Sequence, residues 1–301
     1  MATAFVFSGQ GSQYVGMGRG VVDAHSVAHA CWEEADDSLG FSLSGLVAQG
    51  PEDVLTLTEN AQPAILAYSI VLYRVLQAEK PHVVPVAAAG HSLGEYSALV
   101  AAESLGFSDA LRLVRLRGQA MQQAVPAGVG GMVAVTGLDP EVVRGLCTDG
   151  VELAAQNSPK QCVVAGPVAS LDAFQQRAAE AGARRCMALK VSAPFHSSAL
   201  SPAGERLRVA LAEVKIRAPR YPVIQNVSAS PESDPDQIRE NLVKQVSQTV
   251  RWTDCVDRMR ELGVRDFVEL GPGRILSGLI KKCDRKLSTR FCDRSAFLEQ
   301  F

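Results

Sequence analysis

Short apolar runs alternate along the chain with stretches whose apolar residues recur at helical spacing, which predicts alternating strands and helices. A strand at 4–7 runs into the glycine-containing loop 8–13, and helical spacing then dominates to about residue 80. Helices are predicted there at 27–39 and 63–80, the second beginning at Pro63, because proline is common at helix starts. A strand at 86–89 enters a sharp turn, and helices follow at 92–103 and 108–124. This order is typical of a largely parallel α/β sheet.

The pattern changes after Pro126. Strands are predicted at 131–136, 151–155, 161–166 and 186–191, with one helix starting near Pro140 and another spanning 169–181. This β-α-β-β-α-β order is the ferredoxin-like one. We therefore interpret residues 127–196 as a small domain inserted in a larger one.

The α/β pattern resumes after this inserted segment. Helices are predicted at 198–214, 236–247, 253–262 and after Gly273, with strands at 222–226 and 267–270. The predicted fold class is therefore α/β. A hydrolase-like large domain with a parallel sheet would be formed by residues 1–126 and 197–301, and the ferredoxin-like small domain by residues 127–196.

Composition and charge exclude several classes of protein. Of the 301 residues, 47% are hydrophobic and 21% are charged, as in ordinary globular proteins. The net charge of −2 lacks the basic excess of nucleic-acid-binding proteins. The longest apolar stretch, 64–76, is interrupted by polar residues at helical spacing, so we expect a core helix there and no membrane span. The first residues lack the basic start and apolar stretch of a signal peptide.

The seven cysteines are an odd number and include no Cys-x-x-Cys pair. They indicate reduced thiols in a cytoplasmic protein, with neither a disulfide framework nor a zinc site. His25 and His29 are four residues apart, but no third ligand accompanies them, so we expect an exposed helix face and no metal site. The low net charge and the absence of interaction tails favour a monomer.

The most informative motif is Gly90-His91-Ser92-Leu93-Gly94, which fits the G-x-S-x-G pattern between a predicted strand and a predicted helix. In this context the turn is so crowded that glycine is needed two residues before and two residues after the serine, whose oxygen then projects from the sheet. The alternative is a plain strand-to-helix turn in which the serine caps the helix. The context favours Ser92 as a nucleophile.

A serine hydroxyl needs a base to take its proton, and histidine is the usual one. In enzymes with this turn the base follows the nucleophile in the chain, and His196 is the only histidine of five that does so. It lies where the chain would return from the small domain, and a cleft is expected at such a junction. The alternative is a histidine that caps a helix start. No acidic residue stands out as a third member of the catalytic group.

Together these features resemble one known family. The motifs are Phe-Ser-Gly-Gln-Gly-Ser-Gln at 7–13, Gly-His-Ser-Leu-Gly-Glu at 90–95, Arg117 within Arg-Leu-Arg-Gly-Gln-Ala-Met, and the run 241–252 with Gln245 and Trp252. From residue 3 to about 283 the chain resembles malonyl-CoA:acyl-carrier-protein transacylases and the related acyltransferases of polyketide synthases.

The resemblance implies a Ser–His dyad in which Ser92 is acylated and His196 is its base. Backbone N–H groups of Gln10 and Leu93 would form the oxyanion hole, and a main-chain carbonyl would orient His196. The remaining positions implied for the substrate-binding site are Arg117, which would pair with the malonyl carboxylate, Gln245, which would hold the site in place, and Asn157 and Phe195, which would line the pocket. From its spacing alone, Arg117 would be read as a surface residue of a basic stretch.

The sequence thus predicts a ping-pong acyltransferase that moves malonyl from malonyl-CoA to the phosphopantetheine thiol of an acyl carrier protein, with no bound cofactor. The carrier would serve fatty-acid or polyketide synthesis. A serine acyl-hydrolase that edits acyl carrier proteins is the alternative, since it would share Ser92 and His196 but would not need Arg117. A non-catalytic docking module would need none of these residues.

Overall fold

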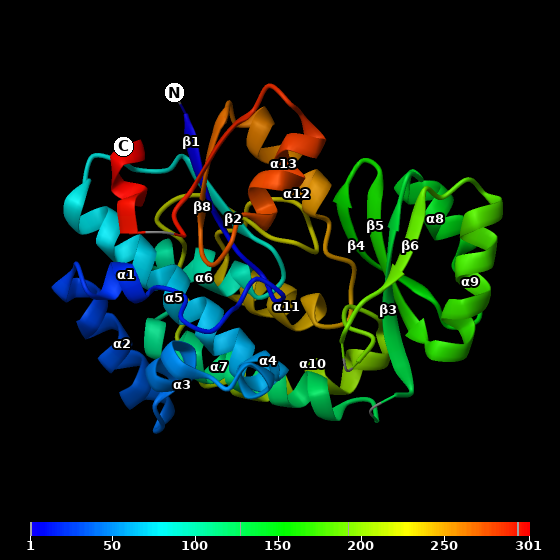
Figure 1. Cartoon of the computed structure of the whole chain (residues 1–301), viewed down its shortest axis with the longest axis horizontal. Helices are drawn as coiled ribbons and strands as arrows, with labels where there is room; N and C mark the ends of the chain where they lie inside the picture. Colours follow the sequence, from blue (N-terminus) through cyan, green and yellow to red (C-terminus); the bar gives the residue numbers. More distant parts are fainter. Residues whose placement is uncertain (1, 127, 192, 294) are drawn as a thin grey trace.

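The computed structural model describes residues 2–126, 128–191, 193–293 and 295–301 (Figure 1). Its larger sheet has five strands in the order β7-β2-β1-β8-β9, and every neighbouring pair is parallel. The strands are β1 (Thr3–Phe7), β2 (Ala87–Gly90), β7 (Val223–Ile224), β8 (Asp266–Leu270) and β9 (Ser288–Phe291). The central strands are almost entirely buried, as expected for a parallel sheet covered on both faces.

Helices cover this parallel sheet. The long helix α5 (Thr58–Glu79) is buried along most of its length and packs against α2 (Ser26–Leu39) and α7 (Phe107–Gln123). The remaining helices of this part are α1 (Arg19–Val22), α3 (Leu43–Gln49), α4 (Glu52–Thr56), α6 (Gly94–Ala101), α10 (Ser201–Ala212), α11 (Pro235–Gln245), α12 (Trp252–Glu261) and α13 (Ile275–Cys283), with short 3₁₀ turns at Ser198–Leu200 and Ser295–Gln300. Figure 1 shows α12 and α13 on the side of the parallel sheet that faces the second sheet.

The second sheet is antiparallel, with its four strands in the order β4-β5-β3-β6. Its elements are β3 (Gly130–Thr136), α8 (Pro140–Leu146), β4 (Glu152–Ser158), β5 (Gln161–Pro167), α9 (Val168–Glu180) and β6 (Arg185–Ala188). It has a hydrophobic core of its own, in which Val164 and Phe174 are fully buried. The predicted fold class, a parallel α/β sheet with a ferredoxin-like unit, is confirmed. The division at residues 127 and 196 stays a prediction; residues 1 and 127 lie outside the described residues.

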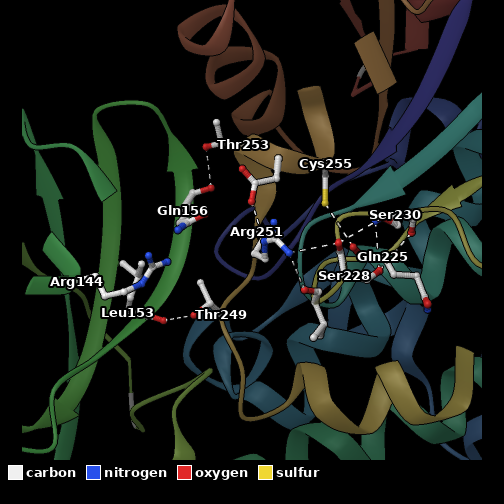
Figure 2. A network of polar contacts seen from close by, with 12 residues as sticks. Arg144, Leu153, Gln156, Gln225, Ser228, Ser230, Thr249, Arg251, Thr253 and Cys255 are labelled. Carbon is white, nitrogen blue, oxygen red and sulfur yellow. Dashed lines mark hydrogen bonds and ion pairs between the residues drawn. The ribbon is translucent and has the colours of Figure 1, made fainter. Parts of the chain in front are cut away.

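The segment 249–253, which follows α11 and includes the start of α12, pairs with β4 of the antiparallel sheet (Figure 2). The Val250 N–H donates to the Ala154 carbonyl, and the Gln156 N–H donates to the Val250 carbonyl, both at 2.9 Å. Threonine hydroxyls on either side add bonds to β4: Thr249 to the Leu153 carbonyl at 2.5 Å and Thr253 to the Gln156 carbonyl at 3.1 Å. Main-chain pairing therefore holds the small sheet against the segment that follows α11.

Some predicted boundaries are wrong. Helix α5 begins at Thr58, five residues before Pro63, because its first turn packs tightly on α7. A Cβ on Gly118 of α7 would lie 2.7 Å from the Glu59 Cα, so this contact requires glycine. Tertiary packing thus outweighs the start signal of a proline. The edge strand β9 was not predicted, and β6 ends at Ala188, three residues before the predicted end.

Among the described residues, no helix combines the length and apolarity needed to cross a membrane. All seven cysteines are free thiols. Within the same residues, no group of three histidine, cysteine or acidic side chains could hold a metal ion, and His25 instead lies 3.4 Å from a Glu79 carboxylate oxygen.

Candidate active site

Ser92 lies in a sharp turn between β2 and α6, at the carboxyl end of the parallel sheet. Its φ of 52° is left-handed, a conformation that non-glycine residues rarely adopt. A Cβ on Gly90 would lie 1.9 Å from the backbone carbon of Gly94, and one on Gly94 would lie 2.1 Å from the Phe7 carbonyl oxygen. The two glycines therefore allow a turn that no larger residue would fit, as the G-x-S-x-G pattern predicts.

Ser92 and His196 are in direct contact, although 104 residues separate them. The Ser92 Oγ lies 2.7 Å from His196 Nε2, and His196 Nδ1 lies 2.8 Å from the Gln245 carbonyl oxygen. Because a carbonyl only accepts, Nδ1 carries the proton and Nε2 is free to accept the hydroxyl hydrogen. Burial, and then the charge of Arg117, lower the pKa of His196 to about 3. The imidazole is therefore neutral and can act as a base.

Arg117 is buried beside the two catalytic candidates and is only 1% exposed. Its Nη2 donates to the Ser92 Oγ at 3.1 Å and to the Gln245 Oε1 at 3.0 Å. Its Nη1 donates to the Gln62 Oε1 at 2.8 Å. Burial lowers the pKa of Arg117. The interpretation as a surface residue of a basic stretch is therefore wrong: Arg117 points inward from α7, toward Ser92.

Gln245, the last residue of α11, contacts all three of these residues. Its Nε2 donates to the Ser92 carbonyl at 3.0 Å, its Oε1 accepts from Arg117, and its own carbonyl accepts from His196. The main-chain carbonyl expected to orient His196 thus belongs to Gln245 itself. Gln245 is fully buried and lies behind Ser92, outside the wall of the cavity.

A cavity of about 690 Å³ opens above Ser92. Its wall includes six of the eight predicted site residues: Gln10, Ser92, Arg117, Asn157, Phe195 and His196. Apolar side chains from α7, from the antiparallel sheet and from the segment after β6 complete it, among them Met121, Met132, Val163, Leu189 and Val191. The cavity therefore lies between the part of the chain with the parallel sheet and the ferredoxin-like part. Its mixed wall can hold a ligand with an apolar segment and a polar group at one end.

Two of the lining residues are held by bonds that cross the site. The Gln10 Nε2 donates to the Thr58 Oγ1 at 3.2 Å, which ties the loop after β1 to the start of α5. The Asn157 Oδ1 lies 2.8 Å from His91 Nε2 and so joins β4 to the turn at Ser92. Within the described residues, no group accepts a hydrogen bond from the backbone N–H of Gln10 or of Leu93. Gln10 lines the cavity, whereas the Leu93 side chain is fully buried outside its wall, and the oxyanion-hole role of both N–H groups stays a prediction.

Asn226 and Glu95, which were not predicted as site residues, form hydrogen bonds that hold the turn at Ser92. Asn226 Oδ1 accepts from the Ser92 N–H and its Nδ2 donates to the Gly90 carbonyl, both at 2.7 Å. The Glu95 carboxyl accepts from the Asn226 N–H at 2.6 Å, and burial raises the pKa of Glu95 to about 7. Asn226 ends the predicted strand 222–226, and a polar residue at the carboxyl end of a parallel strand was the signal available.

Replacing Asn226 by Ala should slow Ser92 acylation about 10- to 100-fold, because both bonds that hold the turn are lost and buried groups stay unpaired. Single-turnover rates, with melting temperatures measured in parallel, would test this. Ser104→Ala is a matched control, since it removes a buried hydroxyl bonded at 2.6 Å to the Arg217 carbonyl, away from the cavity. Equal acylation rates for Asn226→Ala and Ser104→Ala would contradict the role of Asn226.

Comparisons with known proteins agree with this geometry. The model of a family described as the acyl transferase domain matches residues 4–288. The malonyl CoA-acyl carrier protein transacylase of Haemophilus influenzae is 43% identical over 284 residues, which cover 93% of this chain and 91% of the relative.

Solved structures agree as well. An acyl-carrier-protein S-malonyltransferase from Burkholderia pseudomallei is 45% identical, with a TM-score of 0.97 and coverage of 100% of this chain and 99% of the other. A malonyl-transacylase solved in complex with its type II polyketide synthase acyl-carrier protein is 41% identical, with a TM-score of 0.97 and coverage of 100% and 98%. The chain therefore belongs to the acyl transferase domain family, among the malonyl CoA-acyl carrier protein transacylases.

Proposed function

We propose that this chain transfers a malonyl group from malonyl-CoA to the phosphopantetheine thiol of an acyl carrier protein, through an ester on Ser92. One observation carries the proposal: a buried guanidinium donates to the nucleophile itself, with Arg117 Nη2 3.1 Å from the Ser92 Oγ. A neutral acyl group would leave the positive charge of Arg117 unpaired, whereas a malonyl carboxylate can accept two hydrogen bonds from the guanidinium. The names of the relatives support the same substrate and carrier.

The first half-reaction acylates the enzyme. The Ser92 Oγ attacks the thioester carbonyl while His196 Nε2 takes the hydroxyl proton, and negative charge develops on the carbonyl oxygen. The free N–H groups of Gln10 and Leu93 would stabilise this charge by about 3–4 kcal/mol each, as in other oxyanion holes. The tetrahedral intermediate then collapses, the C–S bond breaks, and His196 returns the proton to the leaving coenzyme A thiolate.

The second half-reaction runs these steps in reverse with a different thiol. The pantetheine thiol of the carrier gives its proton to His196 and attacks the malonyl ester, and Ser92 recovers its proton as the ester bond breaks. Phe195 and Asn157 would form part of the wall against the acyl chain and its thiol arm. Every residue in this sequence of steps comes from one chain, so a monomer can act alone, and no cofactor is needed.

The transferase and the hydrolase differ in what completes the reaction. With malonyl-CoA and no carrier, coenzyme A release should show one rapid turnover per enzyme and then nearly stop, because the ester waits for a thiol. Adding a pantetheinylated carrier should restore sustained turnover. The same carrier without its pantetheine arm is the matched control and should restore nothing. Continuous release at an equal rate without carrier would favour the acyl-hydrolase.

A further inference from the structure

Gln62, on α5, is a fully buried polar side chain to which no role has yet been given. Its Oε1 accepts from Arg117 Nη1 at 2.8 Å, while the Gln245 Oε1 accepts from Arg117 Nη2 at 3.0 Å. The guanidinium is thus held from two sides, and both acceptors are amide oxygens without charge. The Ser92 hydroxyl oxygen also accepts from it and is likewise uncharged.

Acidic partners are missing around this cation. In the described parts of the chain, no carboxylate lies within ion-pair distance of Arg117. Glu95 is the acid whose charge acts on Arg117, but its oxygens already accept from the Asn226 N–H and the Gln225 Nε2. Burial raises the pKa of Glu95 to about 7, so near neutral pH this acid is only partly ionised. The Tyr96 ring, whose centroid lies 5.8 Å from the Arg117 guanidinium carbon, is also near this charge, but it is not an anion. Among the described residues, no anion is therefore paired with Arg117.

Such an arrangement is unusual, since buried charges are normally paired. A glutamate at position 62 would have nearly the same shape as glutamine, would meet Arg117 at the same place, and would neutralise its charge. The amide oxygen of Gln62 orients the guanidinium plane as a carboxylate would. Because the amide is uncharged, it does not neutralise Arg117, and the positive charge can pair with an anionic ligand. A carboxylate that enters the cavity then meets an oriented cation with no competing anion.

We propose that Gln62 is a positioning residue that determines specificity: by holding Arg117 through a neutral oxygen, it makes the cavity select acyl groups that end in a carboxylate. This inference rests on the proposed function. It adds that the selectivity depends on the missing negative charge at position 62 as well as on the presence of Arg117.

The test is Gln62→Glu, with kcat/KM measured for malonyl-CoA and for acetyl-CoA. The malonyl-to-acetyl ratio should fall about 10- to 100-fold, the range of a charge-assisted pair, mainly through a higher KM for malonyl-CoA. Gln62→Met is the matched control, because it removes the acceptor without adding charge. It should raise the KM for malonyl-CoA through a less ordered Arg117 while malonyl-CoA remains the preferred substrate. In an Arg117→Ala background, Gln62→Glu should leave the ratio unchanged.

The outcomes separate this inference from the proposed function. A wild-type protein that transfers no malonyl would count against the proposed function. A wild type that transfers malonyl, together with a Gln62→Glu variant of unchanged ratio, would overturn only the inference. If Gln62→Glu does not fold, Gln62→Met decides: unchanged KM and ratio in that variant would mean that Gln62 does not position Arg117.

Discussion

His196→Ala should slow the acylation of Ser92 by malonyl-CoA about 10³- to 10⁴-fold without unfolding the protein, because the serine loses the base that takes its proton. The 2.7 Å contact between Ser92 Oγ and His196 Nε2, and the Gln245 carbonyl behind the ring, are the observations that support this size of effect. Rapid quenching and intact-mass measurement would give the rate at which one malonyl group is added, and peptide mapping would show whether it is attached to Ser92.

The matched control is His25→Ala, since His25 lies beside Glu79 and does not line the cavity. That variant should acylate at the wild-type rate. A malonyl adduct on a residue other than Ser92 would contradict the proposed mechanism. So would a His196→Ala variant in which Ser92 is acylated as fast as in His25→Ala.

The same imidazole has a consequence for pH dependence. An ordinary histidine base becomes protonated below about pH 6.5 and loses activity there. Burial and the charge of Arg117 lower the pKa of His196 to about 3, so the base stays neutral in the free enzyme from pH 8 down to pH 5. Protonation of His196 should therefore cause no fall in kcat/KM over this interval. A loss of kcat/KM with an apparent pKa near 6.5 that His196 alone accounts for would contradict this.

Arg117→Ala should lower the malonyl-to-acetyl ratio in kcat/KM by about 100-fold or more. The variant loses a charge-assisted pair of about 1.5–3 kcal/mol with the malonyl carboxylate. It also loses the buried cation that a neutral acyl group leaves unpaired in the wild type, a penalty of about 3–5 kcal/mol in comparable cases. Malonyl transfer should therefore fall while acetyl transfer rises relative to it.

Arg115→Ala is the control for this second prediction. Arg115 lies on the same helix, but its guanidinium donates to the Asn60 Oδ1 and stacks over the Phe41 ring, outside the cavity wall. Arg117→Lys should give an intermediate ratio, since it keeps the charge but loses the two-pronged geometry. If the ratio in Arg117→Ala equals that in Arg115→Ala, the guanidinium does not select the carboxylate.

Much of the fold could be predicted because its signals are local or periodic. The parallel strands β1 and β2 are apolar almost throughout, and the order of strands and helices distinguishes the ferredoxin-like part from the rest. The errors arise where packing outweighs a local signal. Helix α5 extends past Pro63 because Gly118 lets its first turn approach α7, and β9 exists because β8 offers it an edge to pair with.

The proposed nucleophile could be predicted from a similarly local signal. The pattern that places Gly90 and Gly94 around Ser92 is contained in five consecutive residues and can be read without knowing the fold, although the group that excludes a Cβ at Gly94 is the Phe7 carbonyl of β1. His196 followed from its place in the chain order. Motif resemblance was needed for Arg117, whose spacing alone suggested a surface residue.

What the sequence by itself determined is thus the order of most elements, the glycine pattern of the turn at Ser92 and the choice of histidine, because periodicity, a short motif and chain order are enough to indicate these features. Only the tertiary structure decided which polar groups meet Ser92 and Arg117. Asn226 is 134 residues from Ser92, and Gln62 is 55 residues from Arg117. The direction of a buried amide, the pKa of His196 and the burial of the Arg117 charge arise from contacts and desolvation that exist only once distant segments pack together.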